Sequence, residues 1–87
     1  MSITILLADD HELFRQGLEM LLNAQPDFQV IGLAADGLEA VTQAERLRPD
    51  VAIVDMLMPG MSGMDVTSQI KQRLPDCRII VLSMHDD

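Results

Sequence analysis

Carboxylates follow two apolar segments of the chain, where a charge has a chemical cost. Asp9 and Asp10 come directly after residues 3–8, and Asp55 comes directly after residues 51–54. A carboxylate at the end of an apolar strand is unfavourable unless water, a partner group or a metal ion compensates its charge. These three acids are therefore the first candidates for a functional site.

The rest of the sequence predicts the elements that would position these acids. Continuous apolar runs with β-branched residues predict strands that are buried on both faces, and apolar residues at a helical period predict helices between them. The predicted strands span residues 3–8, 28–34, 51–54 and 78–82. The first predicted helix spans residues 12–24, and two further helices begin at the capping residues Asp36 and Ser62. Such alternation predicts parallel strands with right-handed crossovers. An antiparallel sheet is disfavoured, because no hairpin turn separates the strand-like runs.

Two local patterns predict how the helices begin and which face they bury. Asp36 and Glu39 form a pattern typical of a capping box, in which each side chain accepts a hydrogen bond from the backbone at the helix start. The first helix is expected to bury the stripe that repeats at helical spacing, namely Phe14, Gly17, Leu18, Leu21 and Leu22.

The expected fold class is α/β, a flavodoxin-like, doubly wound parallel sheet. In the flavodoxin-like order 2-1-3-4-5 the first and third strands are neighbours, and ligands bind at the carboxyl edge beside them. That order would bring Asp9, Asp10 and Asp55 into one pocket, with Ser83 at the end of the adjacent fourth strand.

Three carboxylates in one pocket predict a metal site. Two unit charges about 4 Å apart cost roughly 4 kcal/mol at an effective dielectric near 20. A hard divalent cation relieves this repulsion, and oxygen ligands favour Mg²⁺ or Mn²⁺ over zinc. Mg²⁺ commonly also binds phosphate oxygens, so the pocket suits a phosphoryl group to which Ser83 could donate a hydrogen bond. A structural reading stays open for single residues, since Asp9 can be a turn former and Asp10 the cap of the first helix.

Composition limits the partners. The 87 residues predict one domain, and fourteen acids against six bases give a formal net charge of −8. This charge argues against direct binding of nucleic acid or an anionic membrane. The single cysteine, Cys77, fits a reducing cytoplasm. The apolar runs are too short to span a membrane, and no signal peptide is recognisable at the N-terminus.

At this point the sequence resembles the receiver domain of two-component response regulators. The similarity covers the whole chain and rests on the segments LLADDHELFRQGLEMLL, PDVAIVDMLMPGMSGMD and IIVLSMHDD. The Asp-Asp-His start and the Ser-Met-His-Asp-Asp end are most similar to LuxR-type transcriptional regulators.

The resemblance implies a role for each candidate residue. Asp55 would be the phosphoacceptor that takes a phosphoryl group from a sensor histidine kinase. Asp10 would ligate Mg²⁺ directly, Asp9 would act mainly through water, and the backbone carbonyl of Leu57 would complete the protein ligands. Ser83 would be the switch hydroxyl that binds the phosphoryl group.

The resemblance also implies what lies beyond the chain. Complete receivers have five strands and five helices, and a lysine after the fifth strand pairs with the phosphoryl group. Residues 1–87 are expected to be the N-terminal two-thirds of a receiver, without that lysine and without a DNA-binding output domain. Lys71, the only lysine, is expected on the third helix and in solvent. The fourth strand would then be an exposed edge through which the chain could self-associate.

Two other functions remain open at this stage. One is an interaction or dimerisation module that is not phosphorylated, because the lysine strand is missing. The other is a Mg²⁺-dependent phosphatase with an aspartate nucleophile. Such enzymes typically have a second aspartate two residues after the nucleophile, where this chain has Leu57. The expected role is a signalling domain in the cytoplasm, with DNA contacted only through an output domain.

Overall fold

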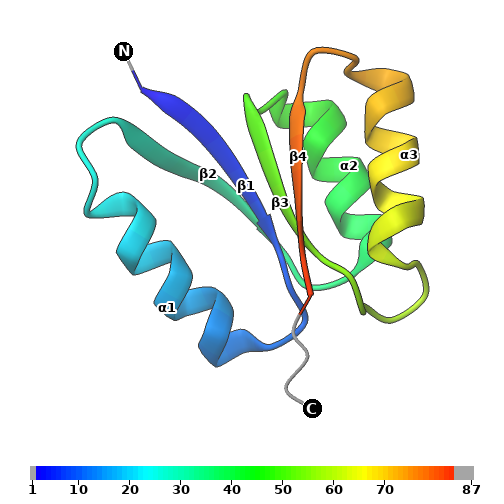
Figure 1. Ribbon diagram of the computed structural model, residues 1–87, viewed down its shortest axis with the longest axis horizontal. Coiled ribbons are helices and arrows are strands. Elements are labelled where there is room, and N and C mark those ends of the chain that lie inside the picture. Colours follow the sequence, from blue (N-terminus) through cyan, green and yellow to red (C-terminus); the bar gives the residue numbers. More distant parts are fainter. Residues whose placement is uncertain (1, 84–87) are drawn as a thin grey trace.

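A computed structural model describes residues 2–83 and confirms the predicted order of elements (Figure 1). Four strands alternate with three helices. Their bounds are β1 Ile3–Ala8, α1 Glu12–Asn23, β2 Phe28–Ala34, α2 Gly37–Leu47, β3 Val51–Asp55, α3 Gly63–Arg73 and β4 Arg78–Leu82. The structure extends the third strand by one residue, so that Asp55 itself ends β3.

The sheet has the strand order predicted for a flavodoxin-like fold. All paired strands are parallel, in the order β2-β1-β3-β4. Ala8 of β1 pairs with Val54 of β3, so these two strands end side by side. The residues that follow Ala8 and Val54 are therefore neighbours at the carboxyl edge of the sheet.

The helices cover the two faces of the sheet unequally (Figure 1). Helices α2 and α3 lie together on one side, and α1 lies alone on the other. The buried core lies mainly between the sheet and the α2–α3 pair, where small and branched residues allow close packing. Its members are Leu6, Ala8, Ala34, Ala40, Val41, Ala44, Ala52, Val54, Val66, Ile70, Leu74 and Cys77.

The predicted inner stripe of α1 is partly wrong. Phe14, Leu18 and Leu22 are half-buried, but Gly17 and Leu21 are exposed, and α1 has no fully buried residue. Because α1 packs chiefly on β1 and β2, only one narrow side of the helix meets the sheet. The periodic pattern identified a helix correctly but overestimated the width of its buried face.

The predicted helix caps of α2 and α3 are confirmed. The Asp36 side chain accepts a hydrogen bond from the Glu39 amide at 2.8 Å, and the Glu39 carboxylate accepts one from the Ala35 amide at 2.7 Å. At the start of α3, the Ser62 hydroxyl oxygen accepts a hydrogen bond from the Asp65 amide at 3.2 Å. These bonds satisfy amides that the helices leave unpaired.

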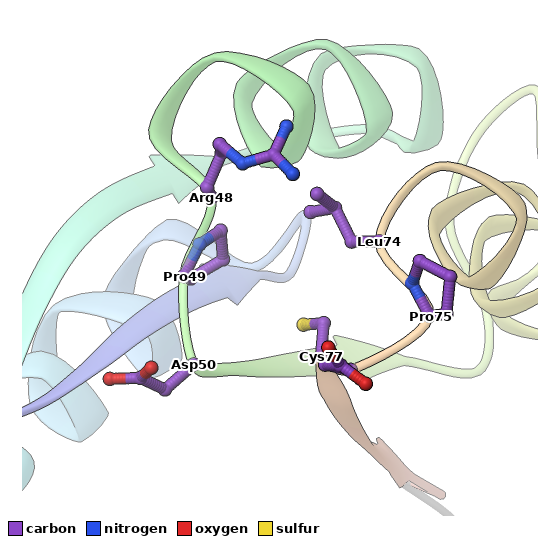
Figure 2. A pocket seen from close by; sticks show the side chains of 7 residues that line it. Arg48, Pro49, Asp50, Leu74, Pro75 and Cys77 are labelled. Atoms are coloured by element: carbon purple, nitrogen blue, oxygen red, sulfur yellow. The ribbon is translucent and has the colours of Figure 1, made fainter.

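The opposite edge of the sheet holds a separate pocket of about 200 Å³. Figure 2 shows its lining side chains, which come from the segment before β3 and the segment between α3 and β4. Lys71 does not simply extend into solvent, because its ammonium group donates hydrogen bonds to the carbonyls of Pro75 and Cys77, at 2.9 and 2.7 Å. It therefore fastens the end of α3 to the start of β4, far from the acidic edge.

No helix within residues 2–83 is long and apolar enough to cross a membrane.

Candidate functional site

The structure brings the three predicted acids together. Asp9 and Asp10 follow β1, Asp55 ends β3, and His11 joins them from the start of α1. Each of these four residues offers a ligand atom, and these atoms all lie within 4.8 Å of one another. The convergence follows from the pairing of β1 with β3, as the strand order predicted.

Asp55 is held at the end of β3 by the loop that follows it. The Met56 amide donates a hydrogen bond to the Leu82 carbonyl at 2.8 Å, and the Leu57 amide donates one to Asp55 Oδ1 at 3.3 Å. Gly63 packs so closely that a Cβ atom there would lie 2.6 Å from the Asp55 carbonyl oxygen. Only a glycine fits this approach, so Gly63 sets where α3 begins relative to Asp55.

Asp9 is nearly as buried as Asp55, with 4% and 1% of the two residues exposed. The Asp9 amide donates to the Ala34 carbonyl at 3.0 Å, and Asp9 Oδ1 accepts from the His11 amide at 2.7 Å. Asp10 is more accessible. It is not the N-cap of α1, because that position belongs to His11, whose side chain makes no capping hydrogen bond. The capping alternative for Asp10 is therefore wrong.

His11, which directly follows the acidic pair in the sequence, is the fourth member of the cluster. Its Nδ1 atom lies 3.1 Å from Asp9 Oδ1, 3.2 Å from Asp10 Oδ1 and 4.0 Å from Asp55 Oδ2. The hydrogen bond to Asp9 and the negative charge of Asp10 raise the pKa of the imidazole above its ordinary value. Its position directly after the acidic pair was the only sequence sign of this contact.

The carboxylates retain unsatisfied oxygens. Asp9 Oδ2 and Asp55 Oδ2 are buried, and neither has a hydrogen-bond partner among the described residues. Burial raises the pKa of the Asp55 carboxyl group, and the charges of Asp9 and Asp10 raise it further, against the opposing effects of the Leu57 amide and His11. Buried carboxylate oxygens without partners, close to one another, fit a hard divalent cation. This donor set suits Mg²⁺ better than a thiolate-preferring metal.

The other two predicted site residues lie at the same edge. Leu57 is exposed, and it lines an open hollow of about 480 Å³ together with Asp10 and residues 58–62. Gly60 in this loop has a φ of 81°, a conformation that favours glycine. Ser83 directly follows β4 and is exposed. Met58 and Met61, in the loop after Asp55, pack against the core.

Comparison with known families identifies the class of this site and fold. Residues 5–87 match the family of response regulator receiver domains. The chain belongs to this family, and the resemblance noted from the sequence is confirmed. Receiver domains are signalling domains that bind Mg²⁺ at an acidic pocket and are phosphorylated by sensor histidine kinases.

Relatives place the chain among LuxR-type response regulators. It is 51% identical over 85 residues to the transcriptional regulatory protein LiaR of Bacillus subtilis, covering 98% of this chain and 40% of that protein. It is 48% identical over 84 residues to the oxygen regulatory protein NreC of Staphylococcus epidermidis, covering 95% of this chain and 38% of that protein. The chain thus spans less than half the length of the curated relatives it matches.

Solved structures agree on the fold. The signal receiver domain of NarL from Mycobacterium tuberculosis superimposes with a TM-score of 0.91 at 36% identity, over 99% of this chain and 69% of that one. The response regulator domain of CheB from Thermotoga maritima superimposes with a TM-score of 0.91 at 38% identity, over 95% of this chain and 61% of that one. The flavodoxin-like architecture is therefore confirmed for residues 2–83.

Replacing Asp55 by Asn is expected to stabilise the metal-free protein. The raised pKa means that the charged form of Asp55 costs stability at any pH above that pKa, and this cost vanishes below the ordinary value of about 4. With EDTA at pH 7, Asp55→Asn should raise the free energy of unfolding by about 1–3 kcal/mol. The gain should shrink as the pH falls toward about 4, and it should also shrink in excess Mg²⁺, which stabilises the unaltered protein. Urea unfolding at pH 7 in EDTA, at lower pH and in excess Mg²⁺ measures these three changes in the free energy of unfolding.

Asp76→Asn is the matched control for this experiment. Asp76 is exposed near the opposite edge of the sheet, so the same change of charge should alter stability by less than about 0.5 kcal/mol. An Asp55→Asn protein no more stable than the original in EDTA would contradict the electrostatic interpretation of the cluster.

Proposed function

We propose that this chain is a phosphoacceptor receiver that takes a phosphoryl group from the histidine of a sensor kinase onto Asp55. The observation that supports this best is the buried Asp55 carboxylate at the end of β3 beside Asp9 and Asp10, whose Oδ2 atom has no hydrogen-bond partner among residues 2–83. A buried charge among like charges is costly in a purely structural residue. It is useful in a nucleophile that needs a metal ion and a phosphoryl group nearby.

Four groups of the chain would hold the ion. The carboxylates of Asp10 and Asp55 and the backbone carbonyl of Leu57 are the proposed direct ligands, and Asp9 would act mainly through water, with Mg²⁺ or Mn²⁺ as the ion. When bound, the ion would supply positive charge that offsets the repulsion between the carboxylates and the phosphoryl oxygens. Both candidate ions accept all-oxygen ligation.

The reaction requires that the Asp55 carboxylate be correctly positioned, and it requires no proton transfer from Asp55. Asp55 Oδ2 would attack phosphorus, an O–P bond would form, and the N–P bond of the phosphohistidine would break, with the electron pair remaining on the kinase imidazole. The Leu57 amide, which donates to Oδ1, orients the carboxylate for this attack. Carboxylates are weak nucleophiles, so alignment and charge neutralisation supply most of the rate.

Ser83 is the proposed switch. The hydrogen bond between the Met56 amide and the Leu82 carbonyl joins the segments that lead to Asp55 and to Ser83. We propose that the Ser83 hydroxyl donates a hydrogen bond to an oxygen of the phosphoryl group. Moving Ser83 toward Asp55 would then change the end of β4 and pass the phosphorylation state on to a partner.

By analogy with its relatives, the chain is proposed to act in a transcription regulator. LiaR is named a transcriptional regulatory protein, and the RcsB structure from Salmonella enterica contains a promoter, at 27% identity to this chain. By analogy, phosphorylation of Asp55 would control a DNA-binding output region in the cytoplasm. The net charge of −8 makes residues 1–87 themselves a poor DNA ligand.

The two alternative functions are less well supported. An interaction module that is not phosphorylated would not need the free Asp55 Oδ2 atom. A phosphatase would need an acid or base two residues after the nucleophile, and Leu57 cannot transfer a proton.

Phosphorylation is tested directly by intact-mass measurement. With acetyl phosphate and Mg²⁺ the chain should gain the mass of one phosphoryl group, and Asp55→Asn should gain none. Asp76→Asn, which makes the same change far from the acidic edge, should be labelled normally. No gain in the unaltered chain would favour the interaction module, and sustained hydrolysis of phosphate esters would favour the phosphatase.

The kinase is proposed to contact the exposed apolar stripe of α1. Leu13 and Met20 are 83% and 74% exposed. They are seven residues apart and therefore lie on the same face of α1, and Leu13 is in the first turn of the helix, next to His11. Large apolar side chains at this exposure, next to the reaction site, fit a surface for a protein partner. Their exposure favours contact with a kinase over a place beside the core.

Leu13→Ala is expected to slow phosphotransfer without preventing phosphorylation. The rate of transfer from a purified, phosphorylated histidine kinase domain that labels the unaltered chain should fall about tenfold, equivalent to roughly 1.4 kcal/mol. Labelling by acetyl phosphate should not change. Leu38→Ala is the control, because Leu38 is 70% exposed but lies on α2. Equal transfer rates for both variants would place the kinase elsewhere.

We also propose that β4 pairs with another strand. Within residues 2–83, β4 ends the sheet, and Ile80 on it is 49% exposed. An apolar edge strand with unpaired backbone groups is a template for a further strand. In a preparation of these 87 residues alone, a second copy of the chain is the strand available.

Sedimentation velocity tests this pairing. The unaltered chain should sediment as a dimer or larger species, and Ile80→Lys should shift it toward the monomer, because a charge on the edge opposes pairing. Leu38→Lys adds the same charge on α2 and should leave the association unchanged. A folded monomer of the unaltered chain at high concentration would refute self-association.

A further inference from the structure

Arg15, in the first turns of α1, lies against the acidic loop but has no part in the chemistry described above. Its Nη1 atom donates a hydrogen bond to the backbone carbonyl of Asp9 at 2.7 Å. Its Nε atom is buried and has no hydrogen-bond partner among residues 2–83. An unpaired buried donor is uncommon in folded proteins and calls for an explanation.

The carbonyl that Arg15 holds belongs to the peptide bond between the two acidic residues. The Asp9 amide is bound to the Ala34 carbonyl, and Asp9 Oδ1 accepts from the His11 amide. With Arg15 on its carbonyl, Asp9 has a partner for each polar group except Oδ2. Because the peptide unit is planar, fixing this carbonyl also fixes the Asp10 amide and the direction in which the Asp10 side chain leaves the backbone.

The loop lacks the interaction that usually orders the start of a helix. The N-cap of α1 is His11, and its side chain accepts no backbone hydrogen bond, whereas Asp36 and Ser62 cap α2 and α3. The amide of Arg15 donates to the His11 carbonyl at 2.9 Å as part of the helix, and its guanidinium reaches back to Asp9. Arg15 thus ties α1 to the end of β1 in place of a capping side chain.

Electrostatics alone would not place Arg15 here to help a cation bind. The guanidinium carries a positive charge, and it lines a small apolar cavity with Leu18, Ile53 and Leu82, where charges are weakly screened. A fixed positive charge beside a cation site repels the cation. Any benefit of Arg15 to metal binding must therefore come from the geometry that its hydrogen bond imposes.

We infer that Arg15 is a positioning residue for the cation site: it holds the Asp9–Asp10 peptide so that both carboxylates are preorganised for Mg²⁺. The inference rests on the proposed function, in which the acidic cluster binds Mg²⁺. It gives the two contributions of Arg15 opposite signs. Loss of its charge should strengthen Mg²⁺ binding, and loss of its hydrogen bond should weaken it.

Isothermal titration with MgCl₂ measures which contribution is larger. Arg15→Met keeps much of the side-chain volume and removes both the charge and the donors. We expect it to weaken Mg²⁺ binding at least tenfold, within the range of about 10–100-fold seen when residues that orient metal ligands are changed. Arg15→Lys, which retains a donor, should lie between Arg15→Met and the unaltered chain. Arg78→Met removes the same charge from an exposed residue at the start of β4 and should bind Mg²⁺ normally.

Hydrogen exchange in EDTA tests the positioning without any metal. The amides of Asp9 and His11, which donate to the Ala34 carbonyl and to Asp9 Oδ1, should exchange faster in Arg15→Met than in Arg78→Met or the unaltered chain, because the loop loses its tie to α1. Circular dichroism confirms folding. If Arg15→Met does not fold, Arg15→Leu, which also removes the charge and the donors, replaces it with the same expectation.

The possible results separate this inference from the proposed function. Unchanged or tighter Mg²⁺ binding by Arg15→Met overturns the role of Arg15 and leaves the proposed function intact. An unaltered chain that does not bind Mg²⁺ contradicts the proposed function and the cation role of Arg15 together. In that case faster exchange in Arg15→Met would still support the tie to the loop, and unchanged exchange would exclude it.

Discussion

The repulsion among Asp9, Asp10 and Asp55 is the constraint on which the rest of the site depends. Parallel pairing of β1 with β3 brings these side chains together, and close carboxylates at low dielectric oppose one another strongly. The protein offsets this only in part, through the Leu57 amide and the imidazole of His11. Two buried carboxylate oxygens remain without partners among the described residues. A site whose negative charge is only partly compensated is stabilised most by a ligand that brings positive charge. The repulsion among the carboxylates is therefore the reason why the site favours a cation.

Most of the fold could be predicted because local patterns and topology agree. Each strand is an apolar run that ends in a polar residue or a turn, and each helix has its own period and stop, so element bounds differ by at most a residue or two from those expected. The strand order followed from the alternation of elements and the known behaviour of parallel sheets. The prediction of the buried stripe of α1 was partly wrong for a specific reason. Periodicity shows that a face is apolar, but how much of it is covered depends on what packs there, and α1 meets only β1 and β2 closely.

The site shows the same division between what strand order determines and what side-chain geometry determines. The meeting of Asp9, Asp10 and Asp55 required only that β1 and β3 be neighbours. The contacts of His11 and Arg15 with the loop, and the close approach of Gly63 to Asp55, depend on the exact path of two short loops. A glycine or an arginine at such positions has many structural explanations in a sequence. Only the structure shows that a side chain at Gly63 would clash and that Arg15 reaches a carbonyl.

The unequal covering of the sheet explains why hydrogen bonds rather than packing must order the metal-binding loop. The face under α2 and α3 holds the core, so the segments that lead into those helices are supported by buried side chains and by the caps Asp36 and Ser62. The acidic loop instead leads into α1, a helix with no fully buried residue and no side-chain cap. Its rigidity then depends on a few directed contacts, with Arg15 as the one from the helix itself. The affinity of a cation site grows with the preorganisation of its ligands. Because α1 is the least packed helix of the fold, a hydrogen bond from α1 to the acidic loop contributes most to that preorganisation.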